Sequence, residues 1–227
     1  AVSSSSTGNV DLGGLNGTDC TAPGGASTGN TNSARTVFYH LTDVSRHASN
    51  FFAPNSSIGS WLNGTLTANT NIDLSCNASY DPGSGELNFQ TSGGGCSNTG
   101  ELAEIIVHEW GHGMDQMGGG TVSEKSSGEA VGDTFAFLTF RDGCIGDNYK
   151  PGVPCDNCLS SCTGVRDIEA FAWGGTSVLA RPSNLAAMGC ACDSSYPGRM
   201  GYEGHCESYI ASTTNWDLTQ LLLDEYS

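Results

Sequence analysis

Basic residues are scarce in this chain. It has 8 lysines and arginines against 24 aspartates and glutamates among 227 residues, which gives a formal net charge of −16 at pH 7. Binding a nucleic-acid backbone requires a surplus of basic side chains that displaces counterions. The composition therefore argues against nucleic acid as a partner.

Long apolar runs are also missing. A transmembrane helix needs about 20 consecutive apolar residues, and the sequence has no such run. The chain begins at Ala1 without a methionine, a basic stretch or an apolar signal core, so we expect a processed start from which an export signal has been removed. Hydrophobic residues still make up 37% of the chain and include four tryptophans, which is enough to build a core.

Cysteine is abundant, in contrast to charge. The chain has 10 cysteines in a background rich in glycine, serine, threonine and asparagine. An even number at this density predicts disulfides, an oxidising environment and hence a secreted, extracellular protein. The pairing cannot be read from the sequence. An alternative is a metal cluster built on Cys155, Cys158 and Cys162, whose spacing resembles that of metal-binding cysteines.

The spacing of apolar residues predicts four helices. Residues 34–52 repeat apolar side chains every three or four positions, which is typical of a helix with one buried face. A second helix covers residues 101–117 and ends at three glycines, residues 118–120. A third begins near Ser126 and a fourth runs from about residue 203 to residue 226. The apolar positions of the third helix are Val131, Phe135 and Leu138.

A small sheet is expected between the first two helices. Residues 57–76 contain short alternating stretches, and the runs 77–80 and 87–90 flank the turn-rich segment 81–85. This pattern predicts a largely antiparallel sheet with one hairpin.

Two other segments lack periodicity. Residues 1–34 indicate loops with one short strand, and residues 142–192, with six of the ten cysteines, indicate a loop-rich, cross-linked region. No internal repeat and no long linker divides the chain, so we expect a single unit.

The sequence His108-Glu109-Trp110-Gly111-His112 carries the clearest chemistry. On a helix, residues four positions apart lie one above the other, so both imidazoles project from the same face and can bind one metal ion. Neutral imidazole suits zinc, and Glu109 on the adjacent surface can take a proton from a metal-bound water. The alternative is a helix with two exposed histidines and a solvated glutamate.

A catalytic zinc site needs a third protein ligand and one open position. The metzincin extension places a glycine and then another ligand at fixed distances after the second histidine, but these positions hold Asp115 and Gly118 here. Glu129 follows His112 by seventeen residues, and two antiparallel helices joined by a glycine-rich turn would bring it to the histidine pair. We therefore predict Glu129 as the third ligand.

Other residues have supporting roles or competing interpretations. Glu129 could instead complete a capping box with Ser126 at the start of its helix. Asp133 lies one turn beyond Glu129 and could accept the remaining N–H of a histidine ligand. His205, beside Cys206, could donate a hydrogen bond to a developing oxyanion or could simply be a surface histidine.

These motifs resemble the thermolysin and fungalysin group of secreted zinc endopeptidases. The match consists of His108-Glu109-Trp110-Gly111-His112 followed by Gly128-Glu129-x3-Asp133, in the same order and helical context. The resemblance implies an α+β, zincin-like catalytic unit over residues 1–227. Its β-rich N-terminal lobe, residues 1–117, would include the active-site helix, and its helical, cysteine-rich C-terminal lobe would cover residues 118–227.

The resemblance also implies roles for residues outside the metal motif. Asn77 and Ala78 resemble the edge strand that aligns the substrate backbone. Arg166 resembles an arginine that holds a substrate carbonyl, and His205 resembles the histidine that stabilises the oxyanion. The relatives usually offer a tyrosine near the oxyanion, and thermolysin has one between its second histidine and its glutamate. Residues 113–128 contain none here, so that donor is either absent or supplied from elsewhere in the chain.

The sequence thus favours a secreted, zinc-dependent endopeptidase. In this hypothesis His108, His112 and Glu129 hold Zn²⁺, Glu109 is the general base and a polypeptide is the substrate. A non-enzymatic secreted or surface module with a structural zinc site is the main alternative. The carboxylate surplus could also bind Ca²⁺, although the sequence has no twelve-residue calcium loop. Neither the cleavage preference nor the oligomeric state can be predicted.

Overall fold

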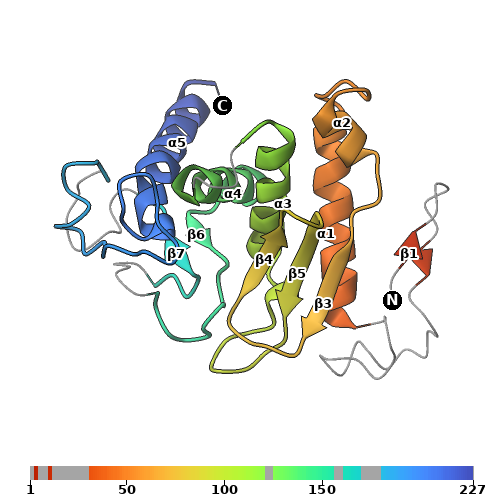
Figure 1. The fold of residues 1–227 in the computed structure, drawn as a ribbon, viewed down its shortest axis with the longest axis horizontal. Coiled ribbons are helices and arrows are strands. Elements are labelled where there is room, and N and C mark those ends of the chain that lie inside the picture. The colour runs from red at the N-terminus through yellow and green to blue at the C-terminus, as the bar shows by residue number, and fades with distance from the viewer. Residues whose placement is uncertain are drawn as a thin grey trace. The chain divides into compact units, whose positions relative to one another are not determined.

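The computed structural model describes residues 3–4, 10–11, 31–120, 125–155, 161–169 and 180–226. The chain divides into two compact units, Ala1–Ile106 and Val107–Ser227, so the division falls inside a helix rather than after residue 117. Figure 1 shows helices and small sheets along the chain. The protein is therefore of the α+β class, as the sequence predicts.

The first unit holds the larger of the sheets. Its elements are β1 (Ser3–Ser4), β2 (Val10–Asp11), α1 (Asn32–Ser49), α2 (Ser57–Leu62), β3 (Ala68–Ile72), β4 (Ala78–Asp81), β5 (Glu86–Gln90), the 3-10 helix η1 (Thr99–Glu101) and the start of α3 (Ala103–Met117). Most of residues 1–34 lie outside the described residues, so the prediction of loops there stays a prediction. Where the structure describes this segment, β1 and β2 pair antiparallel, so it has two short strands instead of the one expected.

The predicted helix after residue 34 is confirmed as α1. Thr31 caps its first turn, because the Thr31 side chain accepts a hydrogen bond from the Ala34 amide at 3.1 Å. The buried face carries Val37, Leu41 and Val44 at helical spacing. In Figure 1 this helix runs alongside the strands of the same unit.

The sheet differs from the sequence expectation in two respects. Its strand order is β3-β5-β4, and β4 pairs with β5 as the predicted antiparallel hairpin. However, β3 pairs with β5 in parallel, so the sheet is mixed. Residues 57–62 form helix α2 instead of extended chain, because Ser56 accepts the Gly59 amide at 3.0 Å and starts a helical turn.

The second unit is mainly helical. Its elements are the remainder of α3, α4 (Lys125–Phe140), β6 (Cys144–Ile145), β7 (Arg166–Asp167) and α5 (Gly204–Tyr226), so the predicted second, third and fourth helices are confirmed. Helices α4 and α5 pack extensively against each other. Their core includes Phe137 and Trp216, whose rings meet edge to face at 5.5 Å.

Each of the two units contains at least one disulfide bond. Three bonds have both cysteines among the described residues: Cys76–Cys96, Cys144–Cys162 and Cys190–Cys206. Cys155 is also disulfide-bonded. Because Cys162 is joined to Cys144, it is not available as a thiolate ligand, and the alternative of a Cys155–Cys158–Cys162 metal cluster is not supported. These bonds are compatible with an extracellular protein.

The helices that the structure describes can be compared with the requirements for a membrane-spanning helix. None of them combines the length and the apolarity of a membrane span.

Candidate metal centre

Helix α3 presents the two histidines of the motif on one face. The His108 and His112 rings lie with their centroids 4.7 Å apart and nearly perpendicular to each other. His108 and Glu109 are buried, whereas His112 is partly exposed. The spacing of four residues therefore places both imidazoles together, as a helix requires.

Helix α4 brings Glu129 to this pair. Glu129 as a whole is 2% exposed, and its Oε2 lies 3.2 Å from His108 Nε2 and its Oε1 3.7 Å from His112 Nε2. One potential ligand atom from each of these three residues lies within 4.8 Å of the others. Two ligand atoms each about 2.1 Å from a tetrahedral ion are roughly 3.4 Å apart. The donor set and its spacing thus fit a metal ion such as zinc.

Two glycines allow α3 and α4 to approach closely. A Cβ on Gly111 would lie 2.8 Å from the Gly132 Cα, and a Cβ on Gly132 would lie 2.6 Å from two atoms of the His108 ring. Side chains at these positions would therefore push the helices apart or displace the ligand histidine. Next to this contact, Trp110 is fully buried and packs edge to face against Phe135 at 5.1 Å.

Replacing Gly132 with alanine should therefore weaken metal binding. We expect the zinc affinity to fall roughly 10- to 100-fold, as when the surroundings of a metal ligand are disturbed. Competition with a chromophoric chelator measures this change. Gly128→Ala is the matched control in the same helix, because its Cβ would meet no atom closer than 3.8 Å. Equal zinc affinities of the two variants would contradict the prediction.

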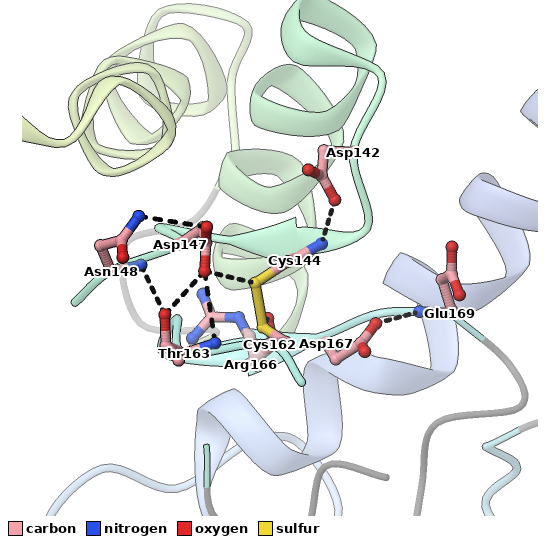
Figure 2. Close-up of a disulfide and its surroundings, with 9 residues drawn as sticks. All are labelled: Asp142, Cys144, Asp147, Asn148, Cys162, Thr163, Arg166, Asp167 and Glu169. Atoms are coloured by element: carbon pink, nitrogen blue, oxygen red, sulfur yellow. Dashed lines mark hydrogen bonds between the residues drawn. A yellow bond between two sulfur atoms is a disulfide. The ribbon is translucent and has the colours of Figure 1, made fainter. Parts of the chain in front are cut away.

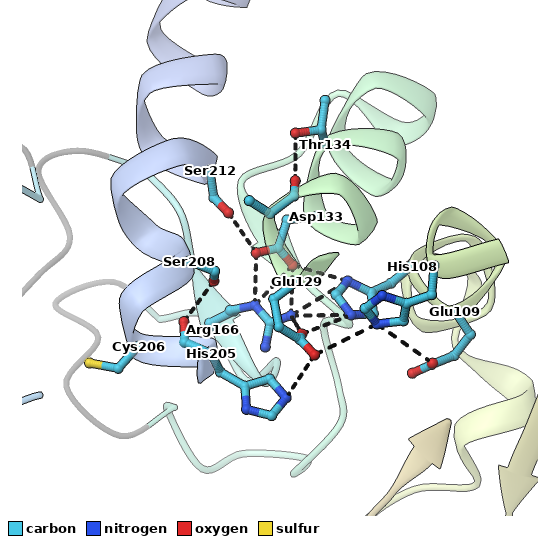
Figure 3. Close-up of polar contacts among 12 residues, drawn as sticks. His108, Glu109, Glu129, Asp133, Thr134, Arg166, His205, Cys206, Ser208 and Ser212 are labelled. Carbon is cyan, nitrogen blue, oxygen red and sulfur yellow. Dashed lines mark hydrogen bonds and ion pairs between the residues drawn. The ribbon is translucent and has the colours of Figure 1, made fainter. Parts of the chain in front are cut away.

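Asp133 and Arg166 form a buried charge network behind the ligands. Asp133 is fully buried, and its Oδ1 lies 3.1 Å from His108 Nδ1. Arg166 Nε donates to both Asp133 oxygens at 2.9 and 3.0 Å, and Arg166 Nη2 donates to Glu129 Oε2 at 3.0 Å. Ser212 Oγ donates to Asp133 Oδ2 at 2.8 Å. Figure 3 shows this convergence of α3, α4, α5 and the β7 arginine.

A short, cross-linked hairpin delivers Arg166 to this network. Ile145 of β6 pairs with Arg166 of β7, and the Cys144–Cys162 disulfide joins the two chain segments (Figure 2). Asp147 also accepts a hydrogen bond from the Thr163 hydroxyl at 2.7 Å. The guanidinium is 7% exposed and is directed at carboxylates. The role in holding a substrate carbonyl stays a prediction.

His205 and Tyr196 meet Glu129 from another direction. His205 opens α5, and its Nε2 lies 3.4 Å from Glu129 Oε1 while its Nδ1 lies 2.6 Å from Glu203 Oε1. The Tyr196 hydroxyl donates to Glu129 Oε1 at 2.6 Å, and the Tyr196 ring stacks on the His205 ring at 4.9 Å. The His205 imidazole and the Tyr196 hydroxyl therefore both lie at Glu129 Oε1.

Sequence reasoning missed Tyr196. Residues 113–128 contain no tyrosine, and nothing in the sequence pointed to Tyr196, which lies in the loop that precedes α5. The usable signal was its position between Cys190 and Cys206, which the structure joins in a disulfide beside His205. That signal becomes informative only when the cysteine pairing is known.

The capping-box interpretation of Glu129 does not match the structure. Helix α4 begins at Lys125, so Ser126 lies inside its first turn, and the Ser126 hydroxyl donates to Glu207 at 3.1 Å. Glu129 is bound to side chains from other elements instead.

The buried charges shift one another's protonation. Burial lowers the pKa of His108, but its contacts with Asp133 and Glu129 outweigh burial and raise that pKa to about 10. Burial and the His108 charge lower the pKa of His112 to about 4. Burial would raise the pKa of Glu129, but His108 holds it well below its usual range. A metal ion at these ligands would therefore have to displace a proton from His108.

The pKa values of Glu109 and Asp133 shift in opposite directions, although both side chains are buried. Burial raises the pKa of Glu109 to about 7, and the His108 charge only partly opposes this effect. Burial would also raise the pKa of Asp133, but Arg166 and His108 lower it to about 2. Asp133 therefore stays ionised at neutral pH, whereas Glu109 is poised to gain or lose a proton.

The remaining predicted residues lie in the first unit. Ala78 is the first residue of β4, and Asn77 directly precedes it. Because the strand order is β3-β5-β4, β4 forms one edge of its sheet. The predicted substrate-aligning role of these residues stays a prediction.

Comparison with known proteins adds no assignment. The chain matches no protein-family model, and no curated protein matches it in sequence.

Proposed function

We propose that this protein is a secreted, zinc-dependent endopeptidase with a two-lobed, zincin-like catalytic fold. One observation carries the proposal: His108, His112 and Glu129 bring two imidazoles and a carboxylate within 4.8 Å in a buried setting. Three protein ligands with a fourth position open is the arrangement of catalytic zinc sites. The adjacent Glu109, from the same helix, supplies the base that such a site needs.

The donor set favours zinc over calcium. Calcium prefers six to eight oxygen ligands, whereas neutral imidazole nitrogens suit zinc. Among the residues that the structure describes, the His108–His112–Glu129 group is the only one with three potential ligand atoms this close together. Calcium binding elsewhere on the chain stays a prediction.

Each residue then has a defined chemical task. Bound zinc would polarise the scissile carbonyl and acidify a water molecule. Glu109 takes the proton of the attacking water at its carboxylate and passes it to the leaving amine. His205 Nε2 donates a hydrogen bond to the developing oxyanion, and the Tyr196 hydroxyl turns its single proton from Glu129 Oε1 to that oxyanion. Asp133 fixes the orientation of His108, and Arg166 keeps Asp133 and Glu129 ionised side by side.

Metal removal tests this function directly. We expect the purified protein to hold about one zinc ion per chain, as a single catalytic site requires. A chelator should abolish cleavage of an unfolded polypeptide, and zinc, but not calcium, should restore it. Product fragments are measured by mass spectrometry. A folded protein with bound zinc that cleaves no unfolded polypeptide would contradict the enzyme and favour a structural zinc module.

A further inference from the structure

Glu207 is a buried carboxylate outside the candidate metal centre. It lies in the first turn of α5 and is 4% exposed. Its two oxygens accept the Met200 backbone N–H at 3.0 Å each, and Oε1 accepts the Ser126 hydroxyl at 3.1 Å. Burying a carboxylate without hydrogen bonds costs free energy, so losing these contacts would destabilise the folded protein.

These contacts join three segments of the second unit. Ser126 belongs to the first turn of α4, Glu207 to the first turn of α5, and Met200 to the loop from Cys190 to Cys206 that the disulfide closes. The Glu207 carboxylate packs tightly against Gly198 of the same loop, because a Cβ at Gly198 would lie 2.4 Å from the Glu207 carboxyl carbon. Glu207 therefore anchors this loop, here called the Cys190–Cys206 loop, to two helices.

The Cys190–Cys206 loop carries Tyr196. The Gly204 amide donates to the Tyr196 carbonyl at 2.8 Å, which ties the tyrosine to the start of α5. The Tyr196 ring stacks on the His205 ring, and the Lys125 ammonium lies over the Tyr196 ring at 5.2 Å from its centroid. The hydroxyl reaches Glu129 Oε1 at 2.6 Å. Met200, held by Glu207, is four residues from Tyr196.

We propose that Glu207 is a positioning residue that fixes the Cys190–Cys206 loop and so keeps the Tyr196 hydroxyl at Glu129. Glu207 contacts no predicted zinc ligand itself and acts through the loop. The kinetic consequence rests on the proposed endopeptidase function, whereas the placement of Tyr196 does not. Loss of the anchor releases Met200 and lets the tyrosine leave the carboxylate.

The placement is tested by ¹⁹F NMR on metal-free protein labelled with 3-fluorotyrosine. The chain has 7 tyrosines, and the resonance missing from Tyr196→Phe identifies that residue. In Glu207→Ala we expect the Tyr196 resonance to move to the position of a solvent-exposed fluorotyrosine. Glu207→Gln keeps an acceptor oxygen for one of the two Met200 contacts, and its resonance should lie in between. Glu225→Ala, at an exposed position of the same helix, should leave the resonance unchanged.

Kinetics then test the consequence. Glu207→Ala should lower kcat about tenfold with little change in KM or zinc affinity, because one oxyanion donor is misplaced while the ligands stay. In a Tyr196→Phe background the same substitution should cause no further loss. If the losses of kcat caused by the two substitutions were additive, Glu207 would not act through Tyr196, and the proposal would be overturned.

The NMR result stands on its own. An unmoved Tyr196 resonance in folded Glu207→Ala, or in Glu207→Gln if the alanine variant does not fold, would overturn the positioning role. A protein without peptidase activity but with the expected resonance shift would instead contradict only the proposed function.

Discussion

Replacing Glu109 with glutamine should nearly abolish peptide hydrolysis while leaving zinc bound. Glutamine has almost the same shape as glutamate but cannot accept the proton of the attacking water. General-base catalysis contributes about 10²- to 10⁴-fold to rates, so we expect kcat/KM to fall by about three orders of magnitude. Glu109 Oε2 lies 4.0 Å from His112 Nε2, so the carboxylate is next to a ligand without belonging to the ligand set.

Two measurements make this prediction specific. Zinc content by atomic spectroscopy should match the unmodified protein, and the melting temperature should not fall, since a neutral amide is cheaper to bury than a carboxylate. Glu104→Gln, in the first turn of the same helix, is the matched control and should keep full activity. Hydrolysis by Glu109→Gln within tenfold of the unmodified protein would exclude Glu109 as the base.

Replacing Arg166 with methionine should cause the largest loss of stability. The guanidinium is 7% exposed and binds two carboxylates, of which Asp133 is fully buried. Methionine fills a similar volume but removes the guanidinium, so that protonated His108 is left as the one cation in contact with both buried carboxylates. Breaking a buried ion pair by removing one partner costs about 3–5 kcal/mol, so we expect a loss of that size in metal-free protein.

Urea denaturation in the presence of a chelator measures this loss. Arg181→Met, at an exposed position, is the control and should change the free energy of unfolding by less than about 0.5 kcal/mol. Arg166→Lys should fall in between, because lysine keeps the charge but cannot bind two carboxylates with a planar fork. A loss below about 1 kcal/mol for Arg166→Met would show that the carboxylates do not depend on this cation.

The helices of this fold could be predicted because their signals are local. Helix α3 has apolar spacing before the motif and glycines after it; its end at Met117 agrees with the prediction, and its start at Ala103 is two residues later than predicted. The buried face of α4 was harder to predict. Leu138 is 50% exposed whereas Phe137 is 1% exposed, because this helix is apolar on several sides and its packing against α5 decides which side is buried.

The sheet shows where local signals fail. Alternation along the chain predicts that a segment is extended, but it does not give the direction of its partner strand, so the parallel pairing of β3 with β5 could not be foreseen. Helix α2 has only six residues, too few for a helical period to show. Its capping serine, Ser56, was the only available signal.

In the candidate site, too, local sequence signals identify some residues and miss the contacts of others. His108, Glu109 and His112 follow from helix geometry alone, and Glu129 follows from two helices joined by a short turn. The contacts of Arg166 and Tyr196 depend on two disulfide-braced segments, and cysteine pairing is a property of the folded chain. Sequence alone therefore locates the predicted ligands and Asp133 beside His108, but not the contacts that Arg166 and Tyr196 make with Glu129.

The short span of the disulfides has a consequence for how the protein matures. Cys76–Cys96, Cys144–Cys162 and Cys190–Cys206 join cysteines that are only 20, 18 and 16 residues apart in sequence. Closing a short loop costs less chain entropy than closing a long one, so near neighbours meet first. Of the three, only Cys76–Cys96 spans no other cysteine, so this bond can form soon after its own span is synthesised. Cys155 and Cys158 lie inside the Cys144–Cys162 span, and Cys192 lies inside the Cys190–Cys206 span. Nearer cysteines therefore compete for these two pairings, and the frame around Arg166 and Tyr196 is set only after thiol–disulfide exchange has removed the competing bonds.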